Sequence, residues 1–375
     1  MRTAKLLLNP VALGAAVLLL LPAVQAQDAA PTTDGLPRPV PCQPHPSARG
    51  YGLTVYDWTT GTAYLFGGVD NQTPSGDYSL FDVWSFTTAT QRWTRRLQTD
   101  RFYNAFQRDA IALDPRSKKV VLYSTFVNCN WNDPWYCGVE TWIYDIRRNT
   151  FENVTSGTEP PLRWGSRMVY DAQSQRAILF GGSDGYTAQT LNETWAYDFQ
   201  SNTWTSMNPA VSPPPHHFAA LAYHPLADRV VLFGGYDIWQ DTVLNDTWTY
   251  DYDTNTWTEL HPDVSPPPRL YHAMAWDVVS NRVVLFGGVS YPYEPLLGDT
   301  WALDLKRGTW TSLDPKPTPS PRAWHVMEGT WGGVLLFGGS PQHEHYTYDD
   351  SWTYNSRRDL WAEVGRCRKA EPCPD

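Results

Sequence analysis

Residues 229–260 read RVVLFGGYDIWQDTVLNDTWTYDYDTNTWTEL, and residues 282–313 read RVVLFGGVSYPYEPLLGDTWALDLKRGTWTSL. Both stretches begin with an apolar run that ends in two glycines. Both continue to an acid-Thr-Trp triplet, and a second tryptophan follows nine residues after the first. A pattern that recurs at this length indicates one supersecondary unit that is stacked several times. The repeat therefore decides the fold.

The glycine pair occurs five times, and a sixth slot is degenerate. The slots are Gly67-Gly68, Ser124-Thr125 (the degenerate one), Gly181-Gly182, Gly234-Gly235, Gly287-Gly288 and Gly338-Gly339. Consecutive slots are 57, 57, 53, 53 and 51 residues apart. The aromatic pair spaced by nine is present in every copy, as Trp84 and Trp93, Trp142 and Phe151, Trp195 and Trp204, Trp248 and Trp257, Trp301 and Trp310, and Trp352 and Trp361. Six copies predict six similar units.

Each copy predicts four short strands. In the fifth copy they are residues 272–277, 282–288, 299–304 and 308–313, which are rich in Val, Thr and Trp and separated by turn-forming residues. One four-stranded sheet cannot bury both of its faces, whereas six sheets packed around an axis can. The sequence therefore predicts an all-β, six-bladed propeller with four antiparallel strands per blade. The predicted blades cover approximately residues 49–98, 106–155, 163–207, 216–260, 269–313 and 322–364.

The repeated residues have structural roles in this interpretation. We expect glycine where strand two ends and another part of the backbone approaches closely. The paired tryptophans should fill the space between adjacent blades, because each ring can bury about 150–250 Å². The arginine that precedes strand one in four copies is also interpreted as mainly structural, for example Arg269 and Arg322.

A glycine pair that closes strand two, followed by spaced aromatic residues at a period of about fifty, resembles the kelch repeat. The similarity extends roughly from residue 49 to residue 364. It implies a kelch-type propeller whose innermost strand is the first of each blade. The resemblance implies little about function, because kelch-like propellers include both binding modules and enzymes.

The chain opens with a segment typical of a secretory signal peptide. Arg2 and Lys5 precede an apolar run to Leu21, and small residues lead to a predicted cleavage after Ala26. We therefore expect a secreted or periplasmic protein without a membrane span in the mature chain. The predicted boundaries are 1–26 for the signal peptide, 27–48 for a Pro-rich linker, 49–366 for the propeller and 367–375 for a C-terminal tail.

Net charge bears on whether the protein binds nucleic acid, and cysteine content bears on disulfides and metal sites. The formal net charge of −10 is spread over the repeats without a basic stripe, which argues against nucleic acid. In an exported protein the five cysteines favour disulfides, and Cys129 and Cys137 are expected to pair across their loop. The other three leave two alternatives, a latch from Cys42 to Cys367 or Cys373, or a local pair between the last two. The spacing predicts no structural zinc site, and no motif predicts a cofactor.

Loop lengths predict which face carries the function. Connections between strands two and three, and from strand four to the next blade, are long and must share one face. Trp131, Trp135 and Trp239 lie in the outer loops of that face. The segments before strand one should converge on the central channel, and their candidate binding residues are Arg108, Asp109, Trp164, His217, Tyr271, His272, Trp324 and His325. The alternative is that these side chains fill a narrow axis.

Aromatic rings beside Asp, Asn and Arg suit a sugar or a protein partner. The favoured prediction is therefore an exported recognition or scaffold module that binds a glycan or protein without a cofactor. The alternative is an enzyme, either metal-dependent and carbohydrate-oxidase-like or sugar-epimerase-like. Tyr271, His272 and His325 stand where galactose-oxidase-like kelch enzymes place copper ligands, but the inner segments carry no cysteine for the Tyr–Cys crosslink of those enzymes. The sequence identifies neither the ligand nor the oligomeric state.

Overall fold

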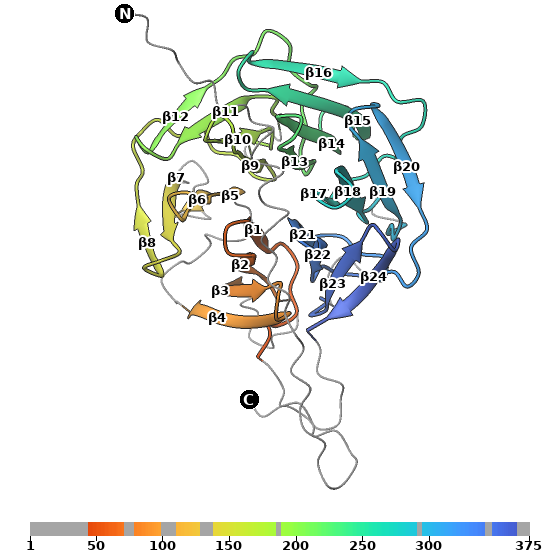
Figure 1. Cartoon of the computed structure of the whole chain (residues 1–375). Helices are drawn as coiled ribbons and strands as arrows, with labels where there is room; N and C mark the ends of the chain where they lie inside the picture. The colour runs from red at the N-terminus through yellow and green to blue at the C-terminus, as the bar shows by residue number, and fades with distance from the viewer. Residues whose placement is uncertain are drawn as a thin grey trace, which may run out of the picture. The chain divides into compact units, whose positions relative to one another are not determined.

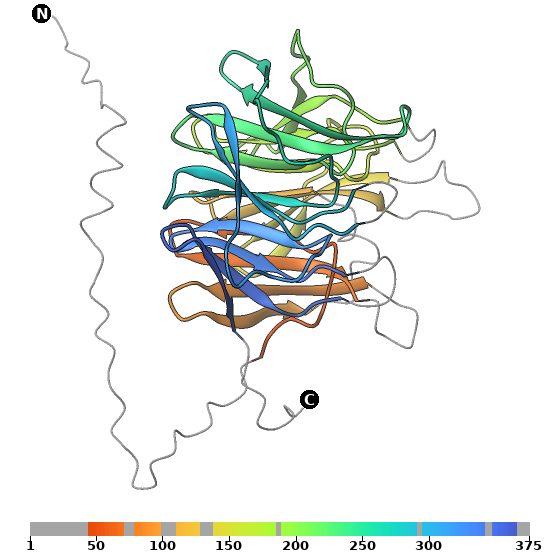
Figure 2. The same ribbon diagram turned by 90° about the vertical axis from the view of Figure 1, so that its right-hand side faces the viewer.

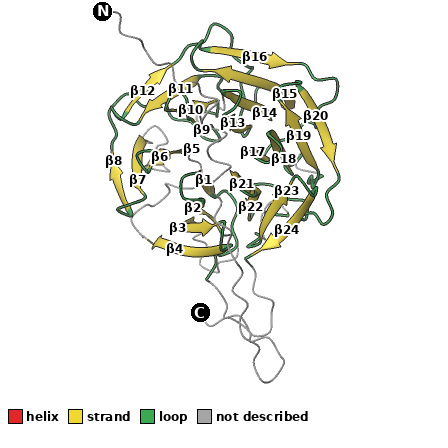
Figure 3. Cartoon of the chain, viewed as in Figure 1, coloured by secondary structure: helices red, strands yellow, loops and turns green. Residues whose placement is uncertain are grey.

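The computed structural model describes residues 44–70, 79–98, 110–127, 138–184, 189–290, 295–341 and 347–365. These residues form six four-stranded antiparallel sheets, and they contain no helix (Figure 3). The sheets surround a central axis as the blades of a propeller (Figure 1). The predicted fold class is therefore confirmed. No helix within the described ranges is long and apolar enough to cross a membrane.

Each blade consists of four consecutive strands, the first beside the axis and the fourth on the perimeter (Figure 1). Seen from the side, the strands run between two faces of the ring (Figure 2). Blade by blade, the strands are β1 (Leu53–Asp57), β2 (Thr62–Val69), β3 (Ser79–Thr87) and β4 (Arg92–Gln98); β5 (Ala110–Asp114), β6 (Lys119–Val127), β7 (Gly138–Asp145) and β8 (Thr150–Asn153); β9 (Arg167–Asp171), β10 (Arg176–Phe180), β11 (Thr194–Asp198) and β12 (Thr203–Ser206); β13 (Ala220–His224), β14 (Arg229–Asp237), β15 (Thr242–Asp251) and β16 (Thr256–Leu260); β17 (Ala273–Asp277), β18 (Arg282–Phe286), β19 (Thr300–Asp304) and β20 (Thr309–Leu313); and β21 (Val326–Thr330), β22 (Gly333–Phe337), β23 (Ser351–Asn355) and β24 (Leu360–Val364).

The glycine pairs connect neighbouring blades. Gly234 has φ +60°, and a Cβ there would lie 2.7 Å from the carbonyl oxygen of Arg269 in the next blade. Gly235 donates its backbone N–H to that same oxygen at 2.9 Å. A side chain at the first glycine would therefore break an inter-blade hydrogen bond. The same carbonyl contact recurs for the pairs that begin at Gly181, Gly287 and Gly338.

The tryptophan of strand four bonds to the preceding blade through the middle residue of the acid-Thr-Trp triplet. Trp257 is 2% exposed, and its ring centroid lies 4.8 Å from that of Phe180. Its Nε1 donates to the buried Thr194 Oγ1 at 2.9 Å. The predicted packing between blades is thereby confirmed. Equivalent bonds join Trp204 to Thr141, Trp310 to Thr247, Trp361 to Thr300 and, across the ring closure, Trp93 to Ser351.

The acid of the triplet holds the arginine that precedes strand one in the same blade. The buried Arg269 donates to both carboxylate oxygens of Asp299 at 2.7 Å and to the carbonyl oxygen of Gly287 at 2.9 Å. Burial would raise the pKa of Asp299, but the hydrogen bonds and charge of Arg269 lower it overall. We call this arrangement the arginine clamp. It recurs as Arg49 with Asp82, Arg163 with Glu193 and Arg322 with Asp350, and His216 with Asp246 replaces it in blade four.

The ring closes in the described residues without a strand shared between the first and last blades. Instead, Tyr51 N donates to the carbonyl oxygen of Trp324 at 3.1 Å, and Arg49 N donates to that of Tyr348 at 3.1 Å. Hydrogen bonds and side-chain packing therefore close the ring. The predicted covalent latch involves Cys42, Cys367 and Cys373, which lie outside the described residues.

Candidate functional site

The segments that lead into strand one place an aromatic residue at the same position in four blades. Tyr51, Phe218, Tyr271 and Trp324 have φ between +55° and +58°, a region that residues other than glycine rarely adopt. Their ring centroids are 4.4 Å apart for Phe218 and Tyr271, 4.8 Å for Tyr271 and Trp324, and 5.4 Å for Tyr51 and Trp324. We call these four residues the aromatic collar. They line one mouth of a cavity along the axis.

Two of the four residues of the aromatic collar, Tyr271 and Trp324, are binding residues predicted from the sequence. The other two, Tyr51 and Phe218, are not among the predicted residues. The missing signal was positional, because all four stand two residues after the Arg or His of the clamp. In blade three this position is Gly165, where a Cβ would lie 2.3 Å from the ring of His217.

Trp164 and His217, both predicted site residues, stand one position earlier in their repeats. Their ring centroids are 4.4 Å apart, and His217 stacks on Phe218 at 3.8 Å. His217 is 3% exposed, and Trp164 is half-buried. The two therefore extend the aromatic collar from blade four to blade three.

The predicted residues His272 and His325 lie mainly in the seams between blades. The His272 ring packs edge-on against Phe233 at 5.5 Å, and the His325 ring packs against Phe286 at 5.6 Å. Burial, followed by the charge of Arg322, lowers the pKa of His325 to about 3. Burial, followed by nearby positive charges, also lowers the pKa of His272 well below its usual value. Both imidazoles are therefore neutral near pH 7, and their edges reach the cavity wall.

Charged groups of the arginine clamps lie near both histidines. Each imidazole lies next to a clamp arginine, whose positive charge opposes a metal cation. Within the described ranges, no group of three or more His, Cys, Asp or Glu side chains is placed to hold a metal ion.

A cavity of about 520 Å³ extends along the axis from the aromatic collar to a second group of aromatic residues. Its wall is mainly apolar and is formed by the innermost strands. Among the described residues that line the cavity, Arg167 in β9 and Glu328 in β21 are the two that belong to the Arg, Lys, Asp and Glu types. Protein atoms surround both side chains. Both residues are nevertheless partly exposed, because they line the cavity.

Sequence reasoning missed Arg167 and Glu328. Burial lowers the pKa of Arg167, and the phenols of Tyr271 and Tyr51 act in the opposite direction. Arg167 lines the same cavity as these two residues of the aromatic collar. Burial raises the pKa of Glu328 to about 8, and a hydrogen bond with Thr54 partly offsets this effect. The cavity therefore contains a positive charge and a carboxyl that is mostly protonated near pH 7.

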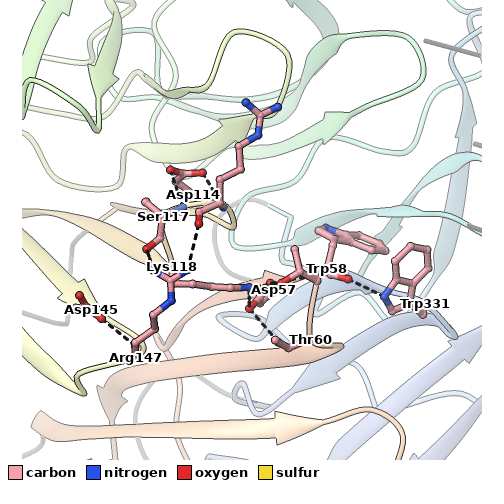
Figure 4. Close-up of polar contacts among 11 residues, drawn as sticks. Asp57, Trp58, Thr60, Asp114, Ser117, Lys118, Asp145, Arg147 and Trp331 are labelled. Carbon is pink, nitrogen blue, oxygen red and sulfur yellow. Dashed lines mark hydrogen bonds and ion pairs between the residues drawn. The ribbon is translucent and has the colours of Figure 1, made fainter. Parts of the chain in front are cut away.

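The opposite mouth opens on the face that carries the short turns, which we call the turn face. Trp58, Trp276 and Trp331 surround it, with ring centroids 5.5 Å apart for Trp58 and Trp276 and 5.3 Å for Trp58 and Trp331. Trp331 Nε1 donates to the carbonyl oxygen of Trp58 at 2.9 Å (Figure 4). The adjacent Asp57 forms an ion pair with Lys118 of the next blade at 2.6 Å (Figure 4). These contacts fix the second mouth, which sequence analysis did not assign.

Trp239 lies on the other face, which carries the strand two-to-three connections and which we call the loop-rich face. It stands at the tip of the hairpin between β14 and β15, and its side chain is 71% exposed. The sequence predicted a loop here, whereas the structure extends the two strands so that the connection is a short turn. Asp237 Oδ1 accepts the backbone N–H of Trp239 at 2.9 Å and stabilises that turn. Other predicted residues lie outside the described ranges, namely Arg108, Asp109, Trp131, Trp135, Cys129 and Cys137.

Comparison with known proteins shows similarity to kelch-repeat proteins over most of the chain. The family model described as the KLHDC2/KLHL20/DRC7 Kelch-repeats domain matches residues 136–339 and 227–375. Kelch domain-containing protein 10 of Homo sapiens is 27% identical over 321 residues, which cover 80% of this chain and 68% of that protein. Kelch domain-containing protein 1 of Mus musculus is 24% identical over 270 residues, covering 65% of each. Adagio-like protein 1 of Oryza sativa subsp. japonica is 32% identical over 180 residues, covering 45% of this chain and 27% of that protein.

The family match, the glycine pairs and the six four-stranded blades agree. Together they show that the chain belongs to the kelch-repeat family.

Proposed function

We propose that this protein is an exported kelch scaffold that binds a protein partner across its loop-rich face. Kelch domains generally mediate protein interactions, and the fold provides a rigid ring for loops. The observation that carries the proposal is the aromatic collar. Left-handed backbone at four aromatic residues is costly, and such strain is typical of binding sites where the surrounding structure holds it in place.

Trp239 supports the same face as the binding surface. In an antiparallel blade, the connection between strands two and three lies at the same end as the segment that leads into strand one. Trp239 and the aromatic collar therefore share the loop-rich face. Exposed tryptophan and tyrosine are typical of the residues that dominate protein interfaces. Tyr51, which is 37% exposed, provides a second anchor at the centre of the face.

Site-specific photocrosslinking tests this proposal. A benzoylphenylalanine at position 239 should crosslink one defined protein in the exported fraction, and Tyr51→Ala should reduce that adduct at least about tenfold. The same probe at position 331 is a matched control, because Trp331 is 47% exposed but lies at the turn face. Equal adducts at the two positions would contradict the proposal. Binding to a glycan array that depends on Tyr51 would instead identify a sugar ligand.

Export is part of the proposal and has its own test. It is supported by the basic start, the apolar run to Leu21 and the small residues before Ala26. The protein recovered outside the cytoplasm should begin at Gln27, as read by N-terminal sequencing. A chain that stays intact in the cytoplasmic fraction would refute export without affecting the assignment of the binding face.

The oxidase-like form of the enzyme alternative can be compared with the positions of the two histidines. His272 and His325 occupy different seams, and each packs on a phenylalanine of the preceding blade. An oxidase-like centre would need further ligands that converge on both imidazoles, and the described residues do not supply them. Our proposal of binding for this face rests on the aromatic collar and Trp239.

A further inference from the structure

The positive charge of Arg167 is not explained by the arginine clamps. Arg49, Arg163, Arg269 and Arg322 each bind a carboxylate of their own blade. Arg167 stands four residues after a clamp position, and its hydrogen bond is from Nη1 to the carbonyl oxygen of the adjacent Ser166 at 3.3 Å. Among the described residues, no carboxylate forms an ion pair with it.

The guanidinium of Arg167 lies where a ligand in the cavity could reach it. Its charge acts on Tyr51, Tyr271 and His272, which belong to blades one and five, although Arg167 itself belongs to blade three. Arg167 also lines the central cavity together with Tyr51, Tyr271 and His272. A buried charge without a counterion is costly, so the site favours an anion.

The remaining walls define what kind of anion fits. Arg167 is the single cationic side chain among the described lining residues, so one negative charge can be matched. The wall of the cavity is mainly apolar and includes Met168, Ala220, Ala273 and Met274. Glu328 does not oppose an anion at neutral pH, because burial raises its pKa to about 8. An apolar body with one negative charge is therefore the complementary ligand.

We propose that the central cavity binds a small organic monocarboxylate with an apolar body. The carboxylate accepts hydrogen bonds from the Arg167 guanidinium, which can bind both of its oxygens. The apolar body lies along the inner strands below the aromatic collar. A volume of about 520 Å³ is within the range of cavities that hold small molecules. The aromatic collar lines the mouth of this cavity and also belongs to the proposed partner surface. The carboxylate site beneath it does not require that partner.

The test uses octanoate and benzoate as probes, with octan-1-ol and benzyl alcohol as neutral counterparts, in calorimetric titrations of the purified chain near pH 7. At least one carboxylate should bind saturably, and its neutral counterpart should bind at least about tenfold more weakly. Arg167→Met should weaken carboxylate binding by a similar factor, whereas Arg167→Lys should retain part of it. Arg176→Met is the matched control on the same blade, because Arg176 pairs with Asp198 away from the cavity lining.

Thermal unfolding without ligand provides a second measurement. If Arg167 serves a ligand, Arg167→Met should unfold at the same or a higher temperature, because the substitution removes an unpaired buried charge. A clear loss of stability or a failure to fold would show that another part of the chain pairs with Arg167, and would overturn the proposal. Equal binding of acid and alcohol, unchanged binding to Arg167→Met, or no binding of either carboxylate would also overturn it. None of these results would bear on crosslinking at Trp239.

Discussion

Replacing Thr194 with valine tests the bond that joins adjacent blades. Thr194 is 1% exposed, and its Oγ1 accepts the indole N–H of Trp257 at 2.9 Å. Valine has nearly the same shape, so the substitution leaves the packing in place and removes the acceptor. The buried N–H then has no partner, which costs about 1–3 kcal/mol. We expect the free energy of unfolding, measured by urea titration, to fall by that amount.

A double-mutant cycle separates the bond from other effects. Trp257→Phe removes the N–H and part of the ring, and it should cost about 1–3 kcal/mol by itself. If the two side chains interact directly, the double variant should be more stable than the sum predicts, by about 0.5–1.5 kcal/mol. Thr258→Val is the control, because Thr258 is an exposed threonine on the outer strand β16. Strict additivity, or a Thr194→Val effect equal to that of Thr258→Val, would refute the role of this bond.

Three further predictions concern the packing between blades, one disulfide and the titration of Glu328. Trp248→Ala or Trp257→Ala should lower the free energy of unfolding by roughly 3–5 kcal/mol, because each leaves a cavity between blades; unchanged thermal unfolding of both would exclude this packing role. Peptide mapping of the exported protein without reduction should find Cys129 crosslinked to Cys137, and free thiols at both would disprove the pairing. Burial raises the pKa of Glu328 from its usual 4.5 to about 8, so its stabilising contribution is full below the first value and lost as pH rises through the second. The free energy of unfolding of Glu328→Gln should therefore match that of the unmodified protein at about pH 5 and exceed it by about 2–4 kcal/mol at about pH 8.5. The same difference at both pH values would exclude this titration of Glu328.

The blade-building residues were predictable because the sequence states their pattern six times. The predicted second strand of blade five, residues 282–288, became β18 (Arg282–Phe286), followed by the glycine pair. Period-two apolar residues, turn residues and spaced tryptophans all report local geometry that recurs in every copy. The role of the central threonine of the triplet was harder to predict from the sequence, because its hydrogen-bond partner belongs to the next blade. Thr194, for example, accepts a hydrogen bond from Trp257.

The candidate site was only partly predictable. Tyr271 and Trp324 were found because the segments before strand one must converge on the axis. His272 and His325 were assigned to the same mouth, but the structure packs their rings in the seams on Phe233 and Phe286. One residue along a repeat changes which neighbour a side chain meets, and the resemblance to kelch enzymes could not resolve that difference. The left-handed backbone that orients the aromatic collar is also invisible to residue type.

The internal repeat does contain a signal for the cavity charges. Arg167 occupies a position that is apolar in the other five blades, where the residues are Leu53, Ala110, Ala220, Ala273 and Val326. Glu328 likewise replaces the apolar residues Val55, Ala112, Val169, Ala222 and Ala275. Five copies show that an apolar side chain satisfies the fold at each position, so folding requires neither the Arg167 guanidinium nor the Glu328 carboxyl. Since burying a charge costs free energy, the departure at Arg167 is better explained by the carboxylate that we propose for the cavity than by what the blades need.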